Sequence, residues 1–351
     1  MMDEFRTLTM EDAADIIEST KNALIVCHSN PDGDAIGSAI ALKRIIVSLG
    51  GRAAVAAPTP LPDYTAFLAE GEEIRCGEAA PEETDCVIAV DTASAAQLGV
   101  LFPLSKKTVL TIDHHASAEP FSPNLTVPTA SAAGEVIFDI YEELRMRGDV
   151  KRYDPDVCRC LFAAISSDTG SFKYSNTTPK TFRIAAELSE IINNAGDGGL
   201  MTWDVSRLIH DTVTEKELRI AAAVPGKIKL YEGGALAVCL ITADDMKRLA
   251  AEERDMGAAI DIVRSLKGVL VAVTLRQRKD GSDSYKISAR ANVDIDVAEV
   301  CGIFGGGGHI RAAGASLNAP SPGKALKLTV DAFAPSVANY LAGGGKNHEQ
   351  K

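Results

Sequence analysis

The stretch CHSNPDGDAIGS at residues 27–38 decides the fold of this chain. It follows a short apolar run over 23–26, which is typical of a buried strand. It precedes an apolar stretch over 39–49 that predicts a helix. In an open α/β sheet, the edge formed by the carboxyl ends of the strands is where ligands bind. The turn at 27–38 is therefore the first place to look for a functional site.

Three side chains on this turn, His28, Asp32 and Asp34, are of types that bind metals. Pro31 and Gly33 bend the loop back on itself. Imidazole and carboxylate groups together suit divalent ions such as Mn²⁺ or Mg²⁺. The alternative is a turn with capping aspartates and no ligand, which an Asn-Pro-Asp-Gly sequence also favours. Three clusters further along the chain bear on this choice.

Short apolar runs alternate with helical patterns over the N-terminal part of the chain. Further strands are predicted at 52–57, 86–90, 108–112 and 124–127, and helices at 9–20, 131–147, 156–166 and 179–194. Thr9 and Asp12 resemble a capping box at the first of these helices. The alternation predicts an α/β domain with a doubly wound, mainly parallel sheet.

The composition changes at the glycine-rich segment 195–200. After a helical stretch over 202–223, two hairpins are predicted, and they indicate a smaller C-terminal α+β domain. Their strands are expected at 227–230, 235–241, 269–276 and 284–290. The predicted organisation is a catalytic metal-binding domain over 1–194, a linker and connecting helix over 195–223, a substrate-binding domain over 224–342 and a disordered tail over 343–351.

Composition excludes several classes of function. The chain has 351 residues, enough for two domains with real cores, and a net charge of -12. This charge argues against a long nucleic-acid duplex as partner, because backbone binding needs many lysines and arginines on one face. No apolar run has the length of a bilayer span, so no membrane association is expected. Seven cysteines without a disulfide-like framework, and an acidic rather than signal-like segment 1–20, predict a cytoplasmic protein.

Two more predicted strands and one helix end in residues of the metal-binding types. These residues are Asp91, the run Asp113-His114-His115, and Asp168 in a Ser-Ser-Asp-Thr-Gly turn. Singly, each could be a helix cap or a satisfied polar residue. Together with the first turn, they would bring five aspartates and three histidines to one edge of the sheet, where the carboxylates repel each other. Two divalent cations would neutralise them, and such a pair of ions hydrolyses phosphate esters.

A run of four glycines at 305–308 precedes His309 in the predicted second domain. Successive backbone N–H groups that are free of side chains form a binding site for anions. With His309 and Arg290, these groups would hold a terminal phosphate or a ribose phosphate. The alternatives are a flexible surface loop for the glycines and a solvated hairpin residue for Arg290.

Taken in order, these motifs resemble the DHH phosphoesterase family over roughly residues 20–318. The resemblance rests on His28-x-Asn-Pro-Asp-Gly-Asp34, Asp91, Asp113-His114-His115, Asp168-Thr-Gly-Ser-Phe and Gly-Gly-Gly-Gly-His309-Ile-Arg-Ala-Ala-Gly314. The chain is most similar to the nano-RNase and pAp phosphatase branch. This resemblance implies a hydrolase that degrades very short RNA to nucleoside monophosphates and removes the 3′-phosphate of 3′-phosphoadenosine 5′-phosphate (pAp). It also implies a pair of divalent cations, with Mn²⁺ preferred to Mg²⁺ or Co²⁺.

The resemblance assigns roles to the residues of the first domain. It implies that His28, Asp32 and Asp91 hold one cation. It implies that Asp34, Asp91, His114 and Asp168 hold the other, so that Asp91 bridges the two. His115 would face the substrate phosphate as a catalytic residue, and Asp113 would orient His114.

The resemblance also assigns a substrate site to the second domain. Ser288 and Arg290 match the Ser-x-Arg stretch of the family, although Ala291 stands where relatives often have serine. The substrate-binding residues would be Ser288, Arg290, Gly306, Gly307, Gly308 and His309. Relatives further imply an active site in the cleft between the two domains, a short single-stranded RNA or a nucleotide as substrate, and a homodimer.

Two other functions use the same residues. A linear or cyclic dinucleotide phosphodiesterase, of the pApA or cyclic di-AMP type, would need the same site, although relatives of that kind usually carry extra N-terminal membrane or sensory segments. A non-catalytic nucleotide-binding module would lack one or more of the metal ligands, and none is missing here.

Overall fold

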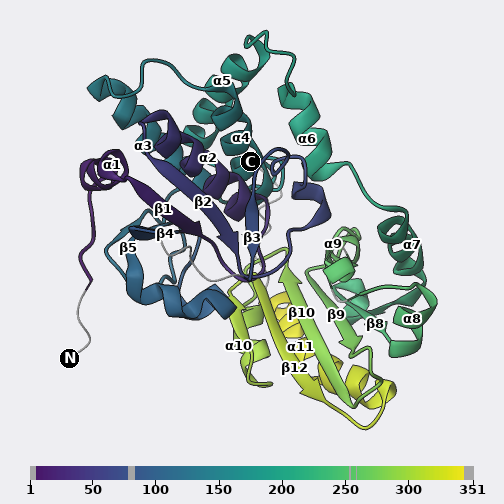
Figure 1. Cartoon of the computed structure of the whole chain (residues 1–351). Coiled ribbons are helices and arrows are strands. Elements are labelled where there is room, and N and C mark those ends of the chain that lie inside the picture. The colour runs from purple at the N-terminus through teal and green to yellow at the C-terminus, as the bar shows by residue number, and fades with distance from the viewer. Residues whose placement is uncertain (1–4, 78–83, 253, 258, 344–351) are drawn as a thin grey trace. The chain divides into compact units, whose positions relative to one another are not determined.

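The computed structural model describes residues 5–77, 84–252, 254–257 and 259–343. The chain forms two compact units, Met1–Thr212 and Val213–Lys351, and each is described by itself (Figure 1). Residues 344–351 of the tail that was expected to be disordered lie outside the described residues. Within the described part of the chain, every helix is too short or too polar to cross a bilayer.

The first unit is built on a sheet of six parallel strands. Across the sheet their order is β3 (Ile74–Cys76), β2 (Arg52–Ala57), β1 (Asn22–Val26), β4 (Cys86–Val90), β5 (Thr108–Asp113) and β6 (Asn124–Thr126). The chain order reverses at β1, because β2 and β3 lie on one side of it and β4 to β6 on the other. The predicted parallel sheet is confirmed. Of these strands, β3 was not predicted from the sequence, because its three residues are too few to show a hydrophobic pattern.

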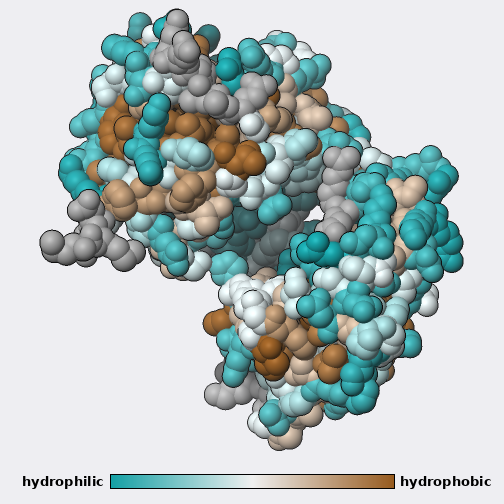
Figure 2. All heavy atoms as spheres, turned by 60° about the horizontal axis from the view of Figure 1, so that its bottom comes forward, coloured by the Kyte–Doolittle hydropathy of each residue, from teal (hydrophilic) through white to brown (hydrophobic). Residues whose placement is uncertain are grey.

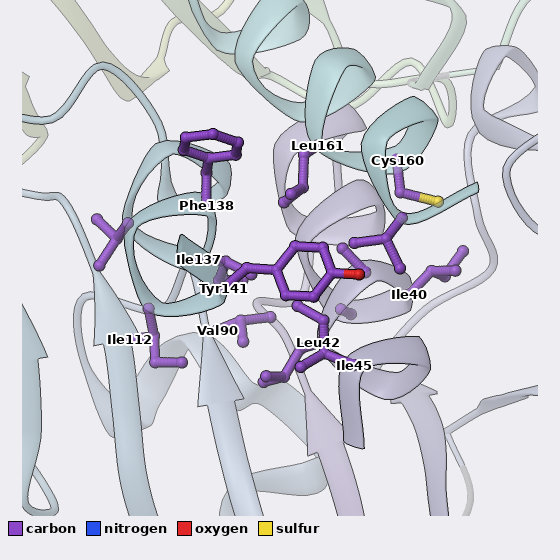
Figure 3. Packing of buried hydrophobic residues seen from close by; sticks show 14 of the residues in the cluster. Ile40, Leu42, Ile45, Val90, Ile112, Ile137, Phe138, Tyr141, Cys160 and Leu161 are labelled. Carbon is purple, nitrogen blue, oxygen red and sulfur yellow. The ribbon is translucent and has the colours of Figure 1, made fainter. Parts of the chain in front are cut away.

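Helices cover one face of this sheet. They are α1 (Met10–Ser19), α2 (Gly33–Ser48), α3 (Ala133–Arg147), α4 (Pro155–Asp168), α5 (Pro179–Asn193) and α6 (Thr202–His210). Of these, α2 and α3 pack directly on the strands, and the others pack mainly on α2, on α3 or on one another. Ile40 of α2, Tyr141 of α3 and Leu161 of α4 pack together with strand residues such as Val90 in one buried core (Figure 3). This core fixes the helices against the sheet and so fixes the loops at its carboxyl edge.

The opposite face carries a thinner layer. There the segment η2 (Ala95–Lys107), a chain of short turns with a break at Gly99, places Leu98 and Leu101 over Leu24 and Val87. Both faces are therefore covered, as the doubly wound expectation requires. The second layer is made of short turns instead of long helices.

Helix α2 begins earlier than the sequence predicts. It starts at Gly33 and not near Ala39, because Asp32 caps it: the Asp32 Oδ1 accepts hydrogen bonds from the N–H groups of Asp34 and Ala35, at 3.0 Å each. Asp34 therefore lies in the first turn of the helix and not in the preceding loop. This corrects the prediction of a tight turn that carries both aspartates.

The predicted helix over 202–223 is two helices. Helix α6 ends at His210, and α7 (Glu215–Ala223) begins in the second unit. The break arises because Thr214 is a strong N-cap: its hydroxyl accepts a hydrogen bond from the Glu217 N–H, and the Glu217 carboxylate accepts one from the Thr214 N–H.

The second unit is built on a mixed sheet of six strands. Their order is β11 (Gly307–His309), β12 (Ala312–Asn318), β10 (Ser284–Ala291), β9 (Val271–Gln277), β8 (Leu236–Ile241) and β7 (Ile228–Tyr231). The two predicted hairpins, β7 with β8 and β9 with β10, are confirmed, and β8 pairs with β9 in parallel. The pair β11 and β12 is absent from the predicted strands, because its glycines and alanines do not form an apolar alternation.

Helices lie on both faces of the second sheet as well. Helices α10 (Val297–Gly302) and α11 (Pro322–Ala342) pack on one face, whose inward residues on β10 are Tyr285, Ile287 and Ala289. Helices α7, α8 (Ala243–Arg248) and α9 (Ala259–Arg264) pack on the other face, over β8 and β9. On the face shown in Figure 2, hydrophobic residues gather in patches on a surface that is otherwise largely hydrophilic.

Candidate active site

The polar residues singled out in the first unit meet at the carboxyl edge of its sheet. His28, Asp32 and Asp34 follow β1, and Asp91 follows β4, its neighbour in the sheet. The next strand, β5, ends at Asp113, which His114 and His115 follow. The chain order reverses between β1 and β4, and at such a switch point the loops diverge and leave room for a ligand.

Ligand atoms of these residues form compact groups. The ligand atoms lie within 4.8 Å of one another in each of three sets. The sets are His28 with Asp32 and Asp91, Asp34 with His114 and Asp168, and Asp91 with His114 and His115. The Nε2 of His28 is 3.3 Å from an Asp91 oxygen, and the Nε2 of His114 is 3.6 Å from Asp91, 3.6 Å from Asp168 and 3.8 Å from Asp34. Each set holds the mixture of imidazole and carboxylate groups that divalent ions bind.

The Asp34 carboxylate is held at the N-terminus of helix α3. It accepts hydrogen bonds from the N–H groups of Ala133 and Gly134, at 2.7 and 2.9 Å, and from the Ser38 hydroxyl at 2.9 Å. Anions are favoured at this end of a helix, because unpaired N–H groups and the helix dipole point at them. These bonds fix the carboxylate while leaving lone pairs for a further ligand.

Asp91 lies in a strained part of the backbone. Its φ of 50° is in the left-handed region, which costs a residue with a side chain about 1–3 kcal/mol and often marks a functional site. The side chain is 3% exposed, and its Oδ1 is buried without a hydrogen-bond partner among the described residues. A buried carboxylate oxygen without a donor fits a position that a cation would satisfy.

The charges of the site are strongly interdependent. Burial, together with the nearby charge of Asp91, raises the pKa of Asp34 well above its usual range, and burial raises the pKa of Asp168 to about 6. Burial alone would lower the pKa of His114. The adjacent Asp91 carboxylate, 3.6 Å away, and the charges of Asp34 and Asp168 outweigh it and raise the pKa of His114 to about 10. Without metal, the His114 imidazolium therefore sits among the carboxylates as their counter-charge.

Asp113 does not orient the ring of His114, contrary to the expectation from the family pattern. Its Oδ1 accepts hydrogen bonds from the His114 backbone N–H and pairs with the Nδ1 of the His115 ring, at 2.8 Å each. This contact favours the His115 tautomer with a proton on Nδ1 and raises the pKa of that ring. Asp113 thus positions His114 only through the backbone, and the ring it orients is that of His115.

Two residues outside the predicted set also contact the acid-bearing segments of this unit. The phenol of Tyr64, in the short turn η1 (Asp63–Thr65), contacts the Gly33 backbone and the Ser167 side chain. The amide of Asn176 donates hydrogen bonds to Asp168. Both lie in irregular segments, where no sequence period could have identified them.

In the second unit, a cavity of about 200 Å³ opens on the face of the sheet that carries α9. Ser288 and Arg290 line it, as do Arg276, Lys286 and Thr274, which the sequence reasoning missed. The signal was available in the hairpin register: Lys286 pairs with Arg276, and Ser288 with Thr274, so these side chains share one face. Three cationic side chains thus line one small cavity in an acidic protein.

The glycine run has a different structure from the anion-binding loop that was expected. Gly307 to His309 form β11, which pairs with β12 from Gly314 to Ala312. A Cβ on Gly306 would lie 2.2 Å from the Gly314 carbonyl oxygen, so only glycine fits there. Gly306, Gly307, Gly308 and His309 are not among the residues that line the cavity.

Comparison with known protein families finds a match in each unit. Residues 22–165 match the DHH family, N-terminal domain, and residues 233–335 match the DHHA1 domain. The bifunctional oligoribonuclease and PAP phosphatase NrnA of Thermus thermophilus is 28% identical over 333 residues, which cover 93% of this chain and 95% of the relative. The protein of the same name from Bacillus subtilis is 26% identical and covers 83% of this chain and 87% of the relative.

A solved structure supports the fold. The crystal structure of an exopolyphosphatase-related protein from Bacteroides fragilis matches with a TM-score of 0.81 and 22% identity, over 94% of this chain and 96% of that one. At this identity, the likeness shows a shared fold.

Proposed function

We propose that this chain, which carries a DHH N-terminal domain and a DHHA1 domain, is a Mn²⁺-dependent phosphohydrolase that acts on very short RNA and on pAp. The observation that carries the proposal is the convergence of carboxylate and imidazole groups at the carboxyl edge of the first sheet, in three sets whose ligand atoms each lie within 4.8 Å of one another. Activity in oligonucleotide degradation and pAp dephosphorylation is named for the Thermus and Bacillus relatives and is proposed here for this chain.

In this proposal the first unit carries out the reaction. His28, Asp32 and Asp91 would hold one divalent cation, and Asp34, Asp91, His114 and Asp168 would hold the other. Bound cations supply positive charge to the scissile phosphate and lower the pKa of water at the site. Asp91 would serve both sets because it directly follows β4, the strand that pairs with β1. His115 would assist the leaving oxygen: the Asp113 contact at Nδ1 raises the pKa of the ring, and the imidazolium would donate its Nε2 proton to that oxygen.

The second unit is proposed to bind the phosphates of the substrate. Arg276, Lys286 and Arg290 line one cavity with Ser288, and such a set of donors suits a phosphate group. The net charge of the chain is -12, so this positive site is local. A local site fits a short anion, whereas a long duplex needs an extended basic face.

Product analysis with and without Mn²⁺ tests the proposal. The protein would be incubated with pAp, pApA, cyclic di-AMP and a 12-nucleotide RNA, with EDTA as the metal-free control. The expected products are AMP from pApA and from pAp, with slow turnover of the longer RNA and no product in EDTA. The Asp91→Ala variant should be inactive. Cleavage of cyclic di-AMP alone would assign the phosphodiesterase alternative, and a fully active Asp91→Ala protein would refute the site.

A further inference from the structure

Asp168 differs from the other acids at the edge of the first sheet. It is the last residue of α4 and not the end of a strand, and its side chain is 30% exposed, against 1% for Asp34 and 3% for Asp91. The C-terminus of a helix carries partial negative charge, which disfavours a carboxylate. Three left-handed residues follow nearby, Gly170, Ser171 and Phe172, with φ values of 55°, 59° and 62°. The helix alone therefore does not hold this side chain in place.

The side chain of Asn176 supplies the missing support. One of the two N–H bonds of its Nδ2 is shared between the Asp168 carbonyl oxygen, at 3.1 Å, and the Asp168 Oδ2, at 3.3 Å. The same nitrogen donates to the carbonyl oxygen of Ser131 at 2.9 Å. One amide thus connects the end of α4 to the segment that precedes α3.

Ser131 is itself held in place by burial and by hydrogen bonds. Ser131 is fully buried, and its N–H and hydroxyl donate hydrogen bonds to the Glu135 carboxylate at 3.2 and 2.7 Å. Two residues further along, the N–H groups of Ala133 and Gly134 hold the Asp34 carboxylate. The start of α3 therefore positions Asp34 directly and Asp168 through Asn176.

We propose that Asn176 is a positioning residue that sets Asp168 at the spacing from Asp34 and His114 needed for tight binding of the second cation. The inference rests on the proposed function, because it concerns the cation held by Asp34, His114 and Asp168. An amide suits this role: it donates hydrogen bonds to a carboxylate without a charge that would compete with the cation. Partners that orient a metal ligand typically contribute 10- to 100-fold to metal affinity.

The test is Mn²⁺ binding by calorimetry to wild type, Asn176→Ala and Asn176→Leu, the second of which keeps the side-chain shape without the donor. Asn193→Ala is the matched control, because Asn193 also uses its amide in side-chain hydrogen bonds, with Ser189 and Thr202. We expect two ions on wild type and on the control. In both Asn176 variants, one ion should bind about 10- to 100-fold more weakly and the other unchanged.

A second readout separates positioning from general damage. At limiting Mn²⁺ the Asn176 variants should hydrolyse pApA slowly, and raising Mn²⁺ about 100-fold should restore kcat with KM for pApA unchanged. Melting in EDTA should remain cooperative and fall by about 2–8 °C in both variants, because the hydrogen bonds to Ser131 and Asp168 are lost, and this loss is separate from the loss of metal affinity. Wild-type affinity for both ions in Asn176→Ala and Asn176→Leu overturns the inference and leaves the proposed function intact. A wild-type protein that binds no Mn²⁺ overturns the proposed function first.

Discussion

Replacing Asp91 by Asn should remove most of the stabilisation that Mn²⁺ gives to the first unit. Asp91 contributes to two of the three groups of ligand atoms, so its charge is expected to act on both ions. With each ion at about 100 times its Kd, binding adds about 2.7 kcal/mol per ion, or about 5 kcal/mol for two. For a unit of the size of Met1–Thr212, this raises the Tm by about 10–20 °C.

The variant keeps the shape of the side chain but loses its charge. If the affinity for each ion falls about 100-fold, the remaining stabilisation is about 0.4 kcal/mol per ion. The Tm shift should then shrink to about 2–3 °C. The assay is differential scanning calorimetry of each protein in EDTA and in Mn²⁺, so that each variant serves as its own metal-free reference.

Asp149→Asn is the matched control, since Asp149 is an exposed aspartate in the same unit and lies in none of the ligand groups. It should keep the full shift. A shift in Asp91→Asn as large as that of wild type would refute the reasoning, because it would mean that the two ions do not share this carboxylate.

Three further results are expected. Mn²⁺ binding should release protons and tighten as pH rises from 6 to 9, because the pKa of His114 is raised to about 10 and its ring must lose a proton to bind a metal. Calorimetry in buffers of different ionisation enthalpy measures the number of protons released. Equal binding heats in all buffers would contradict the prediction. Gly37→Ala should lower the free energy of unfolding of the first unit by about 1–3 kcal/mol, because the new Cβ would lie 2.5 Å from the carbonyl oxygen of Cys160, where α2 packs on α4. Urea unfolding measures this change, and an unchanged unfolding midpoint would contradict the packing. Arg290→Ala should raise KM for pApA by about 10-fold or more while leaving hydrolysis of bis-p-nitrophenyl phosphate nearly unchanged, and equal effects on both substrates would argue against a role in phosphate binding.

Much of the fold could be predicted because its strands carry strong local signals. The apolar runs that become β1, β4 and β5 are short and nearly continuous, as in a sheet buried on both faces. What the sequence did not reveal depends on contacts that are distant or weakly patterned. The start of α2 at Gly33 depends on how Asp32 turns its side chain toward two N–H groups. The hairpin of β11 and β12 depends on glycines and alanines that carry no apolar period.

The candidate site divides in the same way. That Asp91 and His114 would lie near the turn at 27–38 follows from parallel strands, whose carboxyl ends meet at one edge. The contact of Asp113 with the ring of His115 could not be predicted, because it depends on the rotamers of two adjacent side chains. Arg276 could have been found from its register with Lys286. Asn176 could not, because its link to Ser131 spans 45 residues.

The candidate ligands are spread along the chain from His28 to Asp168, and this spacing affects how the protein acquires metal during its synthesis. At roughly 5–20 residues per second, a ribosome needs about 7–27 seconds to translate from Asp34 to Asp168. During that time the emerging polypeptide offers only isolated carboxylates and imidazoles, which hold divalent ions weakly. Ions should therefore bind late, after α4 has left the exit tunnel and packed on the sheet domain. The order of translation thus delays binding of the transition metals that bind these ligands most tightly.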